Sequence, residues 1–115
     1  MKNIQAVNTS FTLDLPDWTV EQLNTLPKYL ASVEERMAAV IEFSRRNFHR
    51  NTGGPFAAGI FERDSGRVVV IGVNRVMSFQ CSSAHAEVMP ISLAQKLLGV
   101  YDLGAPGLPA YQLWW

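Results

Sequence analysis

Apolar and polar residues follow a helical spacing in the first half of the chain. Ser32, Val33, Glu34 and Glu35 form a capping-box pattern, in which a hydroxyl and a carboxylate satisfy backbone amides at a helix start. Apolar residues then recur three and four apart, at Met37, Val40, Ile41 and Phe48. The pattern predicts a helix from Ser32 to the Gly53-Gly54-Pro55 breaker, with these apolar residues on its core face and His49 at the surface or in the C-terminal cap.

Two apolar runs after this helix predict a β-hairpin. The first run covers residues 57–62, and the second covers 67–73 and is almost continuously apolar, as in a strand with both faces covered. Residues 63–66, Arg-Asp-Ser-Gly, separate the runs and are typical of a turn.

The remainder predicts a polar loop over 74–83, a helix over 84–98, a linker over 104–109 and a third strand from Ala110. The core candidates of this helix are Val88, Ile91, Leu93, Ala94, Leu97 and Leu98. The order helix, hairpin, helix, strand indicates an α/β fold with helices on the faces of the sheet.

Residues 1–30 are expected to form an N-terminal arm on a domain of residues 31–115. Pro16 and Pro27 punctuate the arm, and a short helix capped by Asp17 is predicted between them. Three apolar side chains would dock this arm, namely Trp18, Leu23 and Tyr29.

Composition narrows the class of protein. The 115 residues include ten basic and ten acidic side chains, which gives no electrostatic indication of nucleic acid or of an anionic membrane. No stretch approaches the roughly 20 apolar residues of a membrane span, and no secretory signal is recognisable. With Cys81 as the single cysteine, an internal disulfide is excluded and the cytoplasm is the expected compartment.

The candidate chemistry lies in Ser83-Ala84-His85-Ala86-Glu87, at the predicted start of a helix. Residues two apart on a helix do not face each other, so His85 and Glu87 are poorly placed to share one metal. They suit a division of roles, in which His85 binds a metal and Glu87 transfers protons, as in the H-x-E pattern of zinc deaminases. Taken alone, the pair is more simply interpreted as a surface histidine and a glutamate that favours the helix dipole.

Three stretches together make the chain similar to the cytidine/deoxycytidylate deaminase zinc-binding family, and to its guanine deaminase-like branch. They are residues 53–58, residues 72–74 and residues 83–87, placed at a helix end, a strand end and a helix start. The similarity covers roughly residues 31–113. It implies a cytidine-deaminase-like three-layer sandwich, incomplete in this chain.

The resemblance also implies roles for five residues. His85 would be a zinc ligand and Glu87 the catalytic acid and base. Asn74 would hydrogen-bond the base, the backbone N–H of Ala86 would meet a substrate carbonyl, and Phe56 would line the pocket. From the residues alone, Asn74 can equally be a turn residue, and a core position is the favoured interpretation of Phe56.

The sequence departs from the family in several places. The two thiolate ligands of a Pro-Cys-x-x-Cys motif are missing before Trp115, so the chain is expected to be a truncated form. Pro90 is expected to lie two turns into the site helix, where it would kink the helix or cost roughly 3 kcal/mol. Cys81 could join His85 in a metal site, although a free thiol is the plainer interpretation.

Three functional hypotheses remain open. The first is a zinc-dependent hydrolytic deaminase of a nucleobase, with guanine preferred over cytosine, adenine or a nucleoside, and inactive as this chain. The second is a non-catalytic remnant that acts through self-association or a partner, since an unpaired edge strand invites one; a homo-oligomer is expected. The third is an unrelated α/β module in which His85 and Glu87 are incidental.

Overall fold

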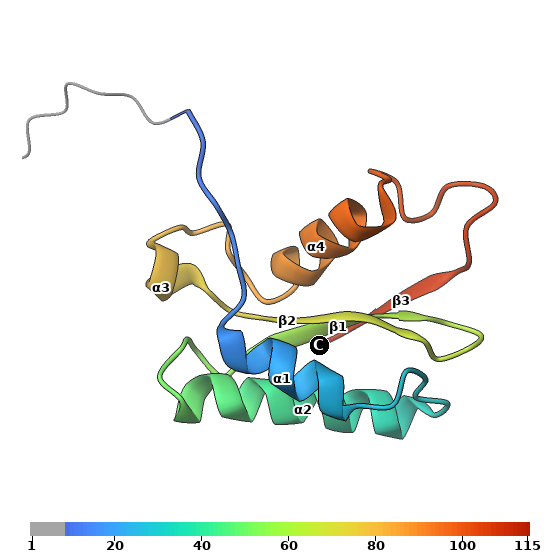
Figure 1. Cartoon of the computed structure of the whole chain (residues 1–115), viewed down its shortest axis with the longest axis horizontal. Helices are drawn as coiled ribbons and strands as arrows, with labels where there is room; N and C mark the ends of the chain where they lie inside the picture. The colour runs from blue at the N-terminus through green and yellow to red at the C-terminus, as the bar shows by residue number, and fades with distance from the viewer. Residues whose placement is uncertain (1–8) are drawn as a thin grey trace, which may run out of the picture.

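The computed structural model describes residues 9–115 as a three-stranded sheet with helices on both faces (Figure 1). Helices α1 and α2 cover one face, and α4 covers the other. The elements in chain order are α1 (Asp17–Thr25), α2 (Val33–His49), β1 (Ala57–Glu62), β2 (Val68–Val73), α3 (Val76–Phe79), α4 (Val88–Leu98) and β3 (Tyr111–Trp114). The predicted α/β order is confirmed, except that the loop over 74–83 contains the short helix α3.

The sheet has the strand order β2-β1-β3, and β1 pairs antiparallel with both neighbours. The hairpin turn ends at Gly66, whose φ of 77° is a conformation that glycine adopts without strain. The outer side of β2 is partly covered, because Val68 N–H donates to Lys28 O and Tyr29 forms a bridge with Arg67. β3 forms the opposite edge of the sheet.

Helix α2 starts where the capping box predicts, with Ser32 and Glu35 bonded reciprocally. Its core face, however, differs from the predicted one. Ile41 and Phe48 are 59% and 57% exposed. The residues buried against the sheet are Arg36, Ala39, Val40, Phe43 and Asn47. Val40 is buried as predicted. Arg36 and Asn47 occupy core positions because each finds hydrogen-bond partners there, and the apolar pattern alone does not identify them.

The segment before α2 packs into the same core. Trp18 is 7% exposed and its ring lies 5.6 Å from that of Phe43, while Leu23 is partly buried against the cluster. The residue before α1 is Pro16, and Asp17 is the first helical residue without a side-chain cap bond, so the predicted cap is wrong. Tyr29 is 56% exposed and contributes only backbone pairing, so its predicted docking role is wrong as well.

Helix α4 begins at Val88, four residues later than predicted. Pro90 is therefore the third helical residue, in the first turn, where backbone amides have no partner inside the helix in any case. The expected kink or penalty at Pro90 does not arise. Leu97 is 69% exposed, which contradicts its place among the core candidates.

The observed arrangement is that of an incomplete three-layer α/β sandwich, as expected. Its largest buried cluster lies between the sheet and helices α1 and α2, and a second one lies between the sheet and α4. Across residues 9–115, no helix has both the length and the apolar character that crossing a membrane requires.

Candidate functional site

A pocket of about 490 Å³ opens beside α2, at the end of the sheet where β1 starts and β2 ends. Residues from four separate parts of the chain and Trp115 line it. They are Met37, Val40, Ile41, Ser44, Pro55, Phe56, Ala57, Asn74, His85, Ala86, Glu87 and Trp115. All five residues singled out in the sequence therefore lie on one pocket, which is the size of an ordinary small-molecule site.

The turn 85–87 lies directly before α4 and not inside it. His85 O accepts a hydrogen bond from Met89 N–H at 3.1 Å, which joins the turn to the first turn of the helix. Ala86 is buried at 4% exposure, whereas His85 is exposed and Glu87 half-buried. His85 and Glu87 both line the same pocket.

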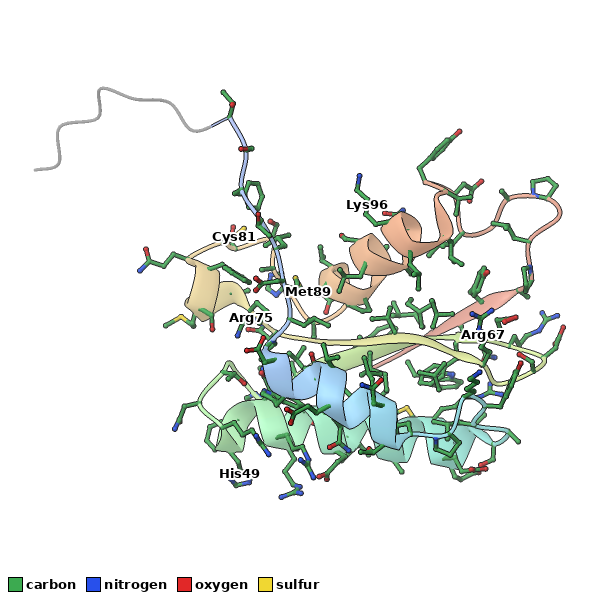
Figure 2. The ribbon with its side chains drawn as sticks, in the orientation of Figure 1. His49, Arg67, Arg75, Cys81, Met89 and Lys96 are labelled. Atoms are coloured by element: carbon green, nitrogen blue, oxygen red, sulfur yellow. The ribbon has the colours of Figure 1, made fainter. Side chains whose placement is uncertain are left out.

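Close packing of α4 on β2 fixes where this turn lies. A Cβ on Gly72 would stand 2.6 Å from Pro90 Cδ and 3.2 Å from Met89 Cβ. Met89, 1% exposed, fills the space between the helix start and the sheet (Figure 2). Only a residue without a side chain at position 72 lets the first turn of α4 approach β2 so closely.

A backbone hydrogen bond joins Asn74 and Phe56 at the open end of the hairpin. Asn74 N–H donates to Phe56 O at 3.0 Å, and Asn74 Oδ1 accepts from Val76 N–H at 3.2 Å. Asn74 is thus a turn residue and a pocket residue at once. The Phe56 side chain is 59% exposed and lies on the pocket wall, so it is not a core residue.

Asn47 was not identified from the sequence. It is fully buried and donates from Nδ2 to Gly54 O at 2.8 Å and to Asn74 O at 3.0 Å. A Cβ on Gly53 would collide with both the Asn47 amide and Asn74 O. A polar residue at a core position of a helix was the available signal in the sequence.

Arg75 was not identified either. It joins the N-terminal segment to the loops around the pocket, because its Nη1 donates to Thr52 O at 2.7 Å and its Nε to Asp14 O at 3.3 Å (Figure 2). Its backbone N–H donates to Ala84 O, next to the candidate turn. Burial lowers the pKa of Arg75, and the nearby Asp14 carboxylate partly opposes this.

Cys81 lies outside the pocket. Its Sγ is 3.1 Å from Ser83 Oγ, and this hydrogen bond is the main cause that lowers the pKa of the thiol. His49 is likewise remote, since it points away from the sheet at the outer side of α2 (Figure 2).

The donors present do not form a complete zinc site. Among residues 9–115, no group of three or more His, Cys, Asp or Glu side chains is placed to hold a metal ion. His85 is the single imidazole on the pocket, with Glu87 beside it. A catalytic zinc takes three protein ligands, and the described residues around His85 do not provide that number.

Solved structures show which proteins this chain is similar to. A guanine deaminase from Nitrosomonas europaea matches 94% of this chain and 58% of its own length, with 45% identity and a TM-score of 0.83. The protein NE0047 in complex with 2,6-diaminopurine matches 93% of this chain and 56% of its own, with 48% identity and the same TM-score. A guanine deaminase from Bacillus subtilis matches 63% of this chain and 45% of its own, at 32% identity and a TM-score of 0.59.

Other comparisons set the limits of this relationship. A tRNA:A34 deaminase is 26% identical over 70% of this chain, with a TM-score of 0.56. No family model matches the sequence, and no curated protein does. The chain spans between about 45% and 58% of the length of the guanine deaminases it matches. Over the length that it spans, the chain is similar to guanine deaminases of the cytidine deaminase-like family.

Proposed function

We propose that the pocket beside α2 binds a purine base of the guanine class, and that the chain provides this half of a hydrolytic deaminase centre. The observation that carries the proposal is the meeting of Phe56, Asn74 and residues 85–87 on one pocket of about 490 Å³. The support from relatives is that NE0047 forms complexes with 2,6-diaminopurine and 8-azaguanine.

In this proposal each pocket residue has a defined task. The apolar side chains of Ile41 and Phe56 contact the faces of the base, and the Asn74 amide hydrogen-bonds its edge. With Asn74 Oδ1 engaged by Val76, the NH₂ group is the part that donates to a ring nitrogen or carbonyl of the base. The N–H of Ala86, in the buried turn, is directed at a carbonyl of the base.

His85 and Glu87 would serve the reaction itself. The family reaction replaces an exocyclic amine of the base with oxygen and releases ammonia, and zinc supplies the activated water when bound. His85 is the ligand that this chain would contribute, and Glu87 the group that transfers protons. Because the remaining ligands are not in these 115 residues, we expect no turnover by this chain alone.

Binding is tested first, by calorimetric titration of the purified chain with 8-azaguanine. We expect saturable binding that Asn74→Ala weakens about tenfold, the size expected for one lost hydrogen bond in a polar site. Asn24→Ala, an exposed asparagine at the end of α1, is the matched control and should bind as the wild type does. Absence of binding, or equal loss in both variants, contradicts the proposal.

Zinc content and activity are tested by comparing this chain with a version extended through a Cys-x-x-Cys segment. We expect zinc and guanine deamination in the extended protein only, loss of zinc on His85→Ala, and loss of activity with retained zinc on Glu87→Gln. Equal zinc in the two lengths would contradict the assignment of His85 as one ligand of a larger set.

A second candidate function is self-association through β3, which would make the chain a non-catalytic, deaminase-like subunit. β3 forms one edge of the sheet, and residues 110–115 carry no charged side chain to block edge pairing. The other edge is partly covered by residues 28–30. A homodimer would pair this edge with its copy.

Light scattering over a range of concentrations measures this association. We expect a dimer mass that Tyr111→Lys, in β3, converts to a monomer, because a charge on an edge strand opposes pairing. Tyr101→Lys, at a 91% exposed position outside the strands, is the control and should leave the dimer intact. A monomer at all concentrations contradicts self-association.

A further inference from the structure

A chain of partly buried hydrogen bonds runs from α1 to the segments that line the pocket. Trp18 Nε1–H donates to Thr52 Oγ1 at 3.0 Å, and Thr52 Oγ1 lies 2.7 Å from Asn47 Oδ1. The Asn47 Nδ2 group then donates to Gly54 O and to Asn74 O. Of the residues joined by these hydrogen bonds, Asn74 alone lines the pocket. The others hold the segments on either side of Asn74 in place.

The chemistry of the groups fixes the direction of every bond. Two backbone carbonyls can only accept, so the Asn47 amide must present its NH₂ group to them and its oxygen to Thr52. The Thr52 hydroxyl accepts from Trp18 and has one proton of its own to donate. Its two acceptors are Asn47 Oδ1 at 2.7 Å and Asn47 O at 3.3 Å, and the bond to Oδ1 is the shorter. A flipped Asn47 amide would therefore lose both of its bonds to the backbone carbonyls.

The two carbonyls belong to the two neighbouring segments that carry Phe56 and Asn74, both of which line the pocket. Gly54 O also accepts from Phe56 N–H at 2.8 Å, in a three-residue turn centred at Pro55. Asn74 N–H returns to Phe56 O at 3.0 Å. One amide group of Asn47 thus closes a ring of hydrogen bonds that sets the position of Phe56 relative to Asn74.

The space around Asn47 leaves no alternative arrangement. Its side chain is fully buried, and the backbone of Gly53 passes so near that a Cβ there would collide with the amide and with Asn74 O. No buried side-chain nitrogen or oxygen in residues 9–115 lacks a partner, so no spare group stands ready to replace a lost bond. Loss of the amide would take from Asn74 O its side-chain donor and would leave Gly54 O with the Phe56 N–H alone.

We propose that Asn47 is a positioning residue for the pocket. It holds the turn at residues 54–56 and the end of β2 at a fixed separation, and Trp18 and Thr52 fix the orientation of its amide. The expected effect on base binding rests on the proposed function, whereas the effect of Asn47 on the positions of Phe56 and Asn74 does not. Helix α1, far from the pocket in sequence, is thereby part of what shapes it.

The experiment compares three variants with a matched control. Thr52→Val removes only the hydroxyl that orients Asn47, and Asn47→Asp keeps an acceptor for Thr52 but removes the NH₂ donor. Asn47→Ala removes both. Thr19→Val makes the same chemical change as Thr52→Val at a fully buried threonine whose hydroxyl donates to Pro16 O, outside the chain of bonds.

Two readouts are measured on the full chain, namely affinity for 8-azaguanine and hydrogen exchange at the amides of Phe56 and Asn74. We expect about tenfold weaker binding and faster exchange at these two amides in Thr52→Val and Asn47→Asp, beyond what the change in global stability explains. Thr19→Val should lower global stability without either local effect.

The outcomes separate this inference from the proposed function. If the wild type does not bind the base, the proposed function fails and exchange alone decides: selective loss of protection in Thr52→Val supports positioning by Asn47. If Thr52→Val and Asn47→Asp exchange and bind as Thr19→Val does, the positioning role is overturned. Should Asn47→Ala fail to fold, the comparison of the two threonine variants still decides the question.

Discussion

Substitution of Gly72 by alanine is the sharpest test of how the candidate site is placed. The added methyl would lie 2.6 Å from Pro90 Cδ, 2.9 Å from Pro90 N and 3.2 Å from Met89 Cβ. These atoms belong to a proline ring, to backbone and to a side chain that is 1% exposed, so none can swing aside. The first turn of α4 must instead move away from β2.

Two opposing effects set how much Gly72→Ala changes the free energy of unfolding. Overpacking of a well-packed interface costs roughly 1–3 kcal/mol, whereas replacing glycine inside a strand recovers roughly 0.5–1 kcal/mol of backbone entropy. We expect a net loss of about 1–2 kcal/mol in the free energy of unfolding. Since residues 85–87 are bonded to this turn through His85 O, affinity for a base should fall as well.

The measurement is urea unfolding followed by tryptophan fluorescence, with Gly104→Ala as the matched control. A Cβ on Gly104 would meet only Asp102 Oδ1 at 3.4 Å, an ordinary contact, and the φ of Gly104 is not left-handed. The control should therefore be neutral or slightly more stable than the wild type. Equal stability of the two variants, within about 0.5 kcal/mol, would refute the close approach of α4 to β2.

Two further predictions concern α2. Hydrogen bonds from Arg45 and then Arg46 lower the pKa of Glu42 to about 2 from its ordinary 4.5, so this stabilisation is present above pH 4.5 and is lost as the pH falls toward 2. In Glu42→Gln the free energy of unfolding should depend less on pH between 4.5 and 2, and the difference from the wild type should stay below about 1 kcal/mol because the pairs are partly exposed. The same pH dependence of unfolding in variant and wild type would contradict this. Arg36→Met should lower the free energy of unfolding in urea by about 2–4 kcal/mol. The buried guanidinium donates to Gln112 Oε1 at 2.8 Å and to three backbone carbonyls, which would be left without these donors. A loss below about 1 kcal/mol would show that water replaces the guanidinium as their partner.

The sequence was a good guide wherever local chemistry decides the structure. The reciprocal bonds of Ser32 and Glu35 start α2 where predicted, because both partners lie within one turn. The two apolar runs around a polar turn produced the hairpin, since pairing of neighbouring strands needs only a short connection. The family resemblance and the fold class rested on such local stretches, and both are confirmed.

The sequence misled where polar side chains enter the core. Arg36 and Asn47 lie on the buried face of α2, while Ile41 and Phe48 remain exposed. Periodicity ranks residues by polarity and does not register a partner 76 or 27 positions away, such as Gln112 for Arg36 or Asn74 for Asn47. Trp18 belongs with these cases, because its bond to Thr52 spans 34 positions.

By itself, then, the sequence determined the order and type of every element except the short helix α3, because helix caps, turns and short apolar runs act over a few residues. The family resemblance added five of the residues that line the pocket. Only the tertiary structure decided that these five residues meet at one pocket and that α4 starts after Glu87 and not before His85. It also decided that Asn47 bonds to the carbonyls of both Gly54 and Asn74. The physical reason is that these features depend on packing distances and hydrogen bonds between segments far apart in the chain, at positions such as Gly72 where a single methyl group would change them.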